Sequence, residues 1–208
     1  MPLFTPPTLL NAPRWKNMRI GLLGGSFNPP HEGHLHISLS ALKGLALDAI
    51  WWLVTPQNPL KTEAPLPFED RMALCRIITA QHPRLLTSGL EKELGTPFTR
   101  ETARALKKAY PDTDFVWIAG MDNALTLHQW NAWRDLLNEI CILCVTRPPA
   151  LSLVQNSPFR MYGREKHVTL RHAGKKPLDS GTAYWMLDKK MLDISSTKIR
   201  ENTLKSNN

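Results

Sequence analysis

The sequence predicts an α/β fold, a Rossmann-like, doubly wound parallel sheet with helices on both faces. Short apolar segments typical of buried strands alternate with longer segments of helical periodicity along most of the chain. A glycine turn directly follows the first apolar segment, and the 208 residues are enough to bury one α/β core. We therefore expect a ligand crevice at the carboxyl ends of the strands.

Each element of this fold has a local signal. The expected strands are Ile20–Leu23, Ile50–Val54, Phe115–Ala119 and Ile140–Val145. The expected helices are His34–Leu45, Phe68–Gln81, Thr99–Tyr110 and Trp133–Leu137, with a last helix that starts near Ser196. Parallel strands end at one edge of a sheet, so the residues that follow them should line the crevice. These residues include Gly24, Pro56, Gly120 and Arg147.

The chain is expected to divide into a flexible N-terminal extension, residues 1–17, and a single domain, residues 18–208. The extension carries four prolines and little periodicity, which is typical of a loosely draped segment. Residues 148–177 are rich in proline and basic side chains, and their pattern predicts no particular element.

Charge and hydropathy restrict the partners. A formal net charge of +8 favours an anionic partner. The basic residues are scattered and form no block of like charge, which argues against a long nucleic acid. No apolar stretch approaches the roughly 20 residues that cross a bilayer, and the start lacks the order of a secretory signal. We expect a cytoplasmic protein without a membrane partner.

The Cys-x-x-Cys at Cys141 and Cys144 falls in an expected buried strand. Residues three apart in a strand point to opposite faces, so these thiols are poorly placed to share a metal ion. They are interpreted as core cysteines in a reducing compartment.

The segment 24–34, Gly-Gly-Ser-Phe-Asn-Pro-Pro-His-Glu-Gly-His, carries the strongest functional signal. Its glycines let the backbone approach an anion and its prolines stiffen the turn. His31 and His34, three apart at an expected helix start, share one face. The segment lacks the glycine spacing of a dinucleotide fold and the Gly-Lys-Ser/Thr of a P-loop, which excludes both. Helix amides together with imidazole donors suit phosphate binding.

Two other interpretations of these histidines stay open, a zinc site and a purely structural pair. The metalloprotease pattern is His-Glu-x-x-His, and here the second histidine comes one residue early. His36 is interpreted as an ordinary helix residue.

A second motif, Ile194-Ser-Ser-Thr-Lys-Ile-Arg200, places hydroxyl residues at an expected helix start. Helix capping alone would explain Ser195 or Ser196. An arginine near exposed amides is also a phosphate ligand, because its planar fork can pair with two oxygens.

Together these two motifs resemble the nucleotidyltransferase superfamily. Two further segments, Thr-Pro-Gln-Asn-Pro-Leu-Lys at 55–61 and Gly-Met-Asp-Asn at 120–123 with Trp130 shortly after, make the chain similar to the nicotinate mononucleotide adenylyltransferases. The resemblance implies a sheet of the nucleotidyltransferase type, with 18–208 as one nucleotidyltransferase domain. It also implies transfer of AMP from ATP to nicotinate mononucleotide, with Mg²⁺ arriving with ATP and no dedicated metal site. A homo-oligomer is compatible with it.

The resemblance also implies the site residues. The catalytic residues would be His31, His34 and Arg200. ATP would bind to Gly24, Gly25, Ser26, Phe27, Gly120, Asp122, Ser196 and Thr197. The mononucleotide would bind to Asn28, Asn58, Lys61, Thr99, Trp130 and Arg147, with Trp130 stacking on the pyridine ring.

Simpler interpretations remain beside these roles. Trp130 could be a core residue, Lys61 a solvated charge and Asp122 a helix cap, and packing explains Trp51 and Trp52. Asn28, Phe98 and Asn123 depart from the family pattern of aspartate, tyrosine and serine, which bears on fine substrate contacts. A transferase with another phosphate acceptor, a class I aminoacyl-tRNA synthetase and a non-enzymatic nucleotide sensor are the competing functions.

Overall fold

The computed structural model describes residues 4–56, 66–146, 157–163, 166–187 and 199. Its centre is a seven-stranded sheet in the order β3-β2-β1-β4-β5-β7-β6, with every neighbouring pair parallel. The strands are β1 Arg19–Gly25, β2 Ala49–Val54, β3 Leu85–Ser88, β4 Asp114–Gly120, β5 Cys141–Thr146, β6 His167–Leu170 and β7 Ala183–Leu187. The chain reverses its direction of travel across the sheet between β1 and β4, and such a switch point is where ligands bind.

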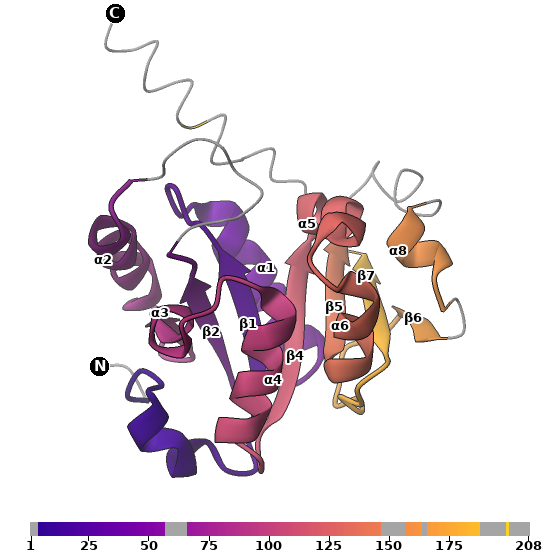
Figure 1. Cartoon of the computed structure of the whole chain (residues 1–208), viewed down its shortest axis with the longest axis horizontal. Coiled ribbons are helices and arrows are strands. Elements are labelled where there is room, and N and C mark those ends of the chain that lie inside the picture. The colour runs from indigo at the N-terminus through magenta and orange to yellow at the C-terminus, as the bar shows by residue number, and fades with distance from the viewer. Residues whose placement is uncertain (1–3, 57–65, 147–156, 164–165, 188–198, 200–208) are drawn as a thin grey trace, which may run out of the picture.

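Helices cover both faces of the sheet, which confirms the predicted doubly wound fold (Figure 1). One face packs against α1 Glu32–Gly44 and α2 Phe68–Thr79. The other packs against α3 Leu90–Leu94, α4 Thr99–Ala109, α5 Met121–Thr126, α6 Trp133–Glu139 and α8 Pro158–Met161, with the short turns η1 Leu9–Trp15 and η2 Leu127–Gln129. Within the described ranges, no helix is long and apolar enough to cross a membrane.

The strands alternate between two cores, one on each face of the sheet. In β2, Trp51 and Leu53 join the core under α4, whereas Ile50 and Trp52 join the core under α1. All six residues of β2 are buried, as a central parallel strand requires. The four predicted strands and four predicted helices all exist, with ends that differ by one or two residues.

The Cys-x-x-Cys behaves as its strand periodicity predicts. Cys141 lies in the core under α1 and Cys144 in the core under α4, on opposite faces of β5. Burial raises the pKa of the Cys141 thiol to about 12 and that of Cys144 further still. Both thiols therefore stay protonated and act as small apolar core groups.

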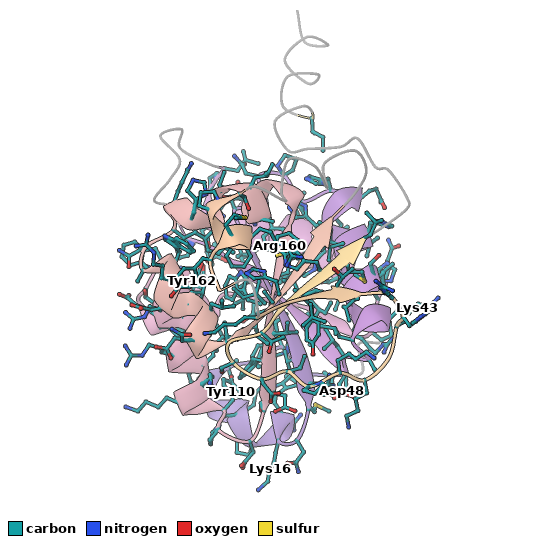
Figure 2. The ribbon with its side chains drawn as sticks, turned by 90° about the vertical axis from the view of Figure 1, so that its right-hand side faces the viewer. Lys16, Lys43, Asp48, Tyr110, Arg160 and Tyr162 are labelled. Carbon is teal, nitrogen blue, oxygen red and sulfur yellow. The ribbon has the colours of Figure 1, made fainter. Side chains whose placement is uncertain are left out.

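The N-terminal segment differs from the loose extension that was expected for residues 1–17. Trp15, at the end of η1, is only 1% exposed and packs edge-on against Trp51 at 5.0 Å between ring centroids. The hydroxyl of Tyr110 donates to the carbonyl of Thr8 at 2.7 Å, and Lys16 pairs with Asp112. Tyr110 and Lys16 are labelled in the lower part of Figure 2. One buried indole thus docks a proline-rich segment onto the core, which corrects the expectation for residues 4–17.

Candidate active site

The glycine turn leaves β1 at the switch point and leads directly into α1. His31 is the N-cap of that helix, with extended backbone angles (φ −152°, ψ 170°), so it lies just before the first helical turn. The N–H of Gly33 donates to Nδ1 of His31 at 3.1 Å, and the N–H of His31 donates to Nδ1 of His34 at 3.2 Å. The two imidazoles therefore form a reciprocal capping box at the start of α1.

This capping box determines the tautomer of both rings. A nitrogen that accepts a hydrogen bond from a backbone N–H carries no proton of its own. Nδ1 accepts in His31 and in His34, so each neutral ring carries its proton on Nε2. The pair can therefore act as two Nε2–H donors, on rings whose centroids lie 3.9 Å apart.

The His34 ring packs against two aromatic side chains. The buried Phe27 ring lies 4.8 Å from His34 and 5.0 Å from Trp52, to which it is nearly parallel, and the His34 and Trp52 rings lie 6.0 Å apart, all measured between ring centroids. The indole Nε1–H of Trp52 donates to Oγ of Ser38, whose hydroxyl donates to the carbonyl of His34. Trp52 is thus a core residue, as its strand pattern predicted, and also supports the backbone and ring of His34.

Close packing explains two of the glycines that were predicted to contact ATP. A Cβ on Gly24 would lie 2.5 Å from Cζ2 of the buried Trp117, so no larger residue fits there. A Cβ on Gly120, at the end of β4, would lie 3.0 Å from Cδ1 of Ile37 in α1. The end of β4 therefore meets the helix that carries the histidines.

Arg71 in α2 is a site residue that the sequence analysis missed. It is 1% exposed, and its four hydrogen bonds to described residues all go to backbone carbonyls. The acceptors are Ser26 (2.7 Å), Thr55 (2.7 Å), Pro56 (2.9 Å) and Leu66 (2.9 Å). The sequence did place Arg71 on the same helix face as the apolar residues Met72 and Cys75, and this position indicates a buried arginine.

The end of β2 is fixed by every polar group of Thr55. Its N–H donates to the carbonyl of Gly25 at 3.0 Å, its carbonyl accepts from Arg71, and its hydroxyl bonds to the buried carboxyl of Glu91. Thr55 thereby links the glycine turn, α2 and α3 at the carboxyl end of β2.

The structure places the described residues of the predicted mononucleotide side at three different elements. Asn28 follows the glycine turn, and its Oδ1 accepts from the N–H of Leu66 at 3.1 Å. Thr99 is the first residue of α4. Trp130 follows η2, is half-buried and packs against the core under α4. Stacking of Trp130 on a ligand therefore stays a prediction.

Several predicted site residues lie outside the described part of the chain. They are Asn58, Lys61, Arg147, Ser196, Thr197 and Arg200, together with the side chain of Asp122. The expected last helix near Ser196 also lies outside it. Convergence of the two terminal motifs on one triphosphate therefore stays a prediction.

Within the described residues, no group of three or more histidine, cysteine, aspartate or glutamate side chains could hold a metal ion. His31 and His34 instead cap a helix through Nδ1. The described residues around the histidines thus offer hydrogen-bond donors rather than a cage of metal ligands.

We expect Glu91 to make stability depend on pH. Burial raises the pKa of its carboxyl to about 7 from the ordinary value of 4.5, and the bond to Thr55 opposes this only in part. Between these pH values the folded state keeps a proton that the unfolded state has released, so stability should fall as pH rises from about 4.5 to about 7. Glu91→Gln, which has no proton to lose, should lack this decrease, which is on the order of 3 kcal/mol.

Urea unfolding at about pH 5 and about pH 8 measures the effect. The matched control is Glu93→Gln, an exposed carboxylate of the same helix, which should keep the pH dependence of the parent protein. Equal losses of unfolding free energy in the parent protein and in Glu91→Gln would contradict the assignment.

The sheet, its switch point and the capped histidine pair together define a protein of the nucleotidyltransferase class. The family model described as Cytidylyltransferase-like matches residues 22–202. A probable nicotinate-nucleotide adenylyltransferase of Cereibacter sphaeroides is 43% identical over 88% of this chain and 97% of its own length. That of Parvibaculum lavamentivorans is 40% identical over 88% of this chain and 92% of its own length. The chain belongs to the nicotinate-nucleotide adenylyltransferase family.

Solved structures share the fold. Nicotinic acid mononucleotide adenylyltransferase of Plasmodium falciparum, complexed with NaAD, has a TM-score of 0.67 at 17% identity and covers 91% of this chain and 89% of its own. The same protein complexed with APC has a TM-score of 0.65 at 17% identity, covering 88% of this chain and 83% of its own. These likenesses confirm the nucleotidyltransferase type of the sheet.

Proposed function

We propose that the protein transfers AMP from ATP to nicotinate mononucleotide, giving nicotinate adenine dinucleotide and pyrophosphate in NAD biosynthesis. Family membership supports this reaction. The observation that carries it is the capped pair His31 and His34, whose tautomers place two N–H donors at a helix start beside the switch point. Such donors are suited to phosphate oxygens on which charge develops.

In this reaction an oxygen of the mononucleotide phosphate attacks the α-phosphorus of ATP. The bond from that phosphorus to the α,β-bridging oxygen breaks, and its electron pair leaves with pyrophosphate. A phosphate monoester is already anionic near neutral pH, so no general base is needed. Catalysis then consists of positioning and of stabilising charge, and His31, His34 and Arg200 are the residues that we assign to the second task.

The remaining site residues divide between the two substrates. We assign the ATP phosphates and adenosine to Gly24, Gly25, Ser26, Phe27, Gly120, Asp122, Ser196 and Thr197. We assign the mononucleotide to Asn28, Asn58, Lys61, Thr99, Trp130 and Arg147. Mg²⁺ would arrive with ATP, held mainly by phosphates and water, and would neutralise the charge of the leaving pyrophosphate. We also predict that the protein is cytoplasmic. Its lack of nucleic-acid and membrane partners and its homo-oligomeric state are predictions too.

Pyrophosphate release tests the proposal. The protein is mixed with Mg²⁺-ATP and, in separate reactions, with nicotinate mononucleotide, nicotinamide mononucleotide or phosphopantetheine. Turnover with nicotinate mononucleotide is the expected result, and its rate relative to the amide measures ring preference. If phosphopantetheine is the only acceptor that reacts, the assignment of nicotinate mononucleotide as substrate is wrong. ATP binding without pyrophosphate release from any mixture would indicate a nucleotide sensor.

A further inference from the structure

Arg71 carries a positive charge into the protein interior without a counter-ion among the described residues. Its guanidinium is instead surrounded by the carbonyls of Ser26, Thr55, Pro56 and Leu66. Burying a cation costs free energy that hydrogen bonds must offset, and the same burial lowers the pKa of this arginine. A residue used only to fill the core between α2 and the sheet would not need a guanidinium.

The four carbonyls come from the glycine turn, from the end of β2 and from the residue just before α2, which Arg71 brings together. Nη1 bridges Ser26, in the glycine turn, and Thr55, at the end of β2. Nε bonds to the carbonyl of Leu66, and the N–H of that same residue donates to Asn28. The turn from Ser26 to Asn28 is therefore fixed at both ends, directly at Ser26 and through Leu66 at Asn28.

We propose that Arg71 is a positioning residue that fixes the turn from Ser26 to Asn28, on which the ATP side and the mononucleotide side of the site meet. This inference rests on the proposed function, which assigns Ser26 to ATP and Asn28 to the mononucleotide. Among the described residues, the hydrogen bonds of Arg71 go only to backbone carbonyls, so it acts through the turn. The planar fork matters because a lysine, with one nitrogen, cannot reach four carbonyls that lie around three guanidinium nitrogens.

Arg71→Lys keeps the charge and loses the fork. We expect the KM values for ATP and for nicotinate mononucleotide each to rise about tenfold, since hydrogen bonds from charged groups are among the strong ones. Arg71→Gln, which also loses the charge, should be more severely impaired. The matched control is Arg76→Gln, an exposed arginine on the same helix, which should leave both KM values within about twofold. Unchanged KM values, with activity lost only in proportion to unfolded protein, would overturn the proposal.

A second pair of variants tests the indirect link and keeps both Arg71 and the carbonyl of residue 66 that accepts from it. Leu66→Pro removes the N–H that donates to Asn28, whereas Leu66→Ala keeps that N–H and removes only the exposed side chain. We expect Leu66→Pro to raise the mononucleotide KM about fivefold over Leu66→Ala, with the ATP KM within twofold. Equal mononucleotide KM values in the two variants would overturn the indirect link.

Calorimetric titration with a non-hydrolysable ATP analogue separates this inference from the proposed reaction. If the parent protein binds the analogue but does not turn over nicotinate mononucleotide, the proposed function fails on its own. The Arg71 inference still requires about tenfold weaker binding of the analogue by Arg71→Lys, and equal affinities would contradict it.

Discussion

Replacement of His34 by asparagine is expected to lower kcat about 10²- to 10³-fold with little loss of stability. The asparagine Oδ1 takes the place of Nδ1 and can still accept from the N–H of His31, so the start of α1 keeps its cap. The Nε2–H donor is lost. The measurement is the steady-state rate of pyrophosphate release, together with the melting temperature.

His34→Gln is the matched variant with the opposite expectation. Its amide nitrogen extends toward the position of Nε2, and glutamine at the third helical position is itself a capping-box residue, so the start of α1 keeps a cap. We expect stability close to that of the parent protein and more activity than in His34→Asn. Near-normal turnover of His34→Asn would remove this imidazole from the catalytic residues, and equal activity of the two variants would contradict a role for the Nε2–H donor.

Replacing the adjacent glycines by alanine should have different effects: Gly24→Ala should lower stability, whereas Gly25→Ala should weaken ATP binding. In Gly24→Ala the new Cβ would lie 2.5 Å from the buried ring of Trp117, so the turn or the ring must move. We expect a loss of about 3 kcal/mol and a melting temperature lower by about 10 °C. Thermal unfolding measures this directly.

Gly25→Ala is the control for packing and the test for phosphate binding. Its Cβ would lie 3.5 Å from Cε2 of Phe27, an ordinary contact, so the melting temperature should change by less than about 2 °C. If the turn holds phosphate, the added methyl group should nevertheless weaken ATP binding, because it obstructs close approach of the backbone. Normal ATP affinity of Gly25→Ala would contradict a phosphate site at this turn.

The sequence predicted those parts of the fold that have a strong local pattern. β1, β2, β4 and β5 are buried on both faces and read as continuous apolar runs. β3 was missed because it has four residues and ends in Thr87 and Ser88, which are buried without being apolar. β6 was missed because it lies within residues 148–177, whose proline and basic residues predicted no element. β7, which follows that segment, was missed as well.

Other features depend on contacts between distant segments, and one sequence does not display these. Trp15 looked like part of a loose extension until the structure showed it against Trp51. The histidine pair was predicted from its spacing, but its tautomers depend on which ring nitrogen caps the helix. The position of Arg71 on the apolar face of α2 indicated burial but not its partners, because its four acceptors are backbone carbonyls and carry no residue-type pattern.

The three bonds of Thr55 have a consequence for how the protein captures its ligands. Because they tie the β2 end to three other elements, this rim of the crevice becomes ordered while the chain folds. The entropy cost of ordering this segment is then part of folding, so ligand binding does not have to offset it. Discrimination between similar pyridine rings at this rim should accordingly depend on a rigid, preformed shape rather than on loop closure around the ligand.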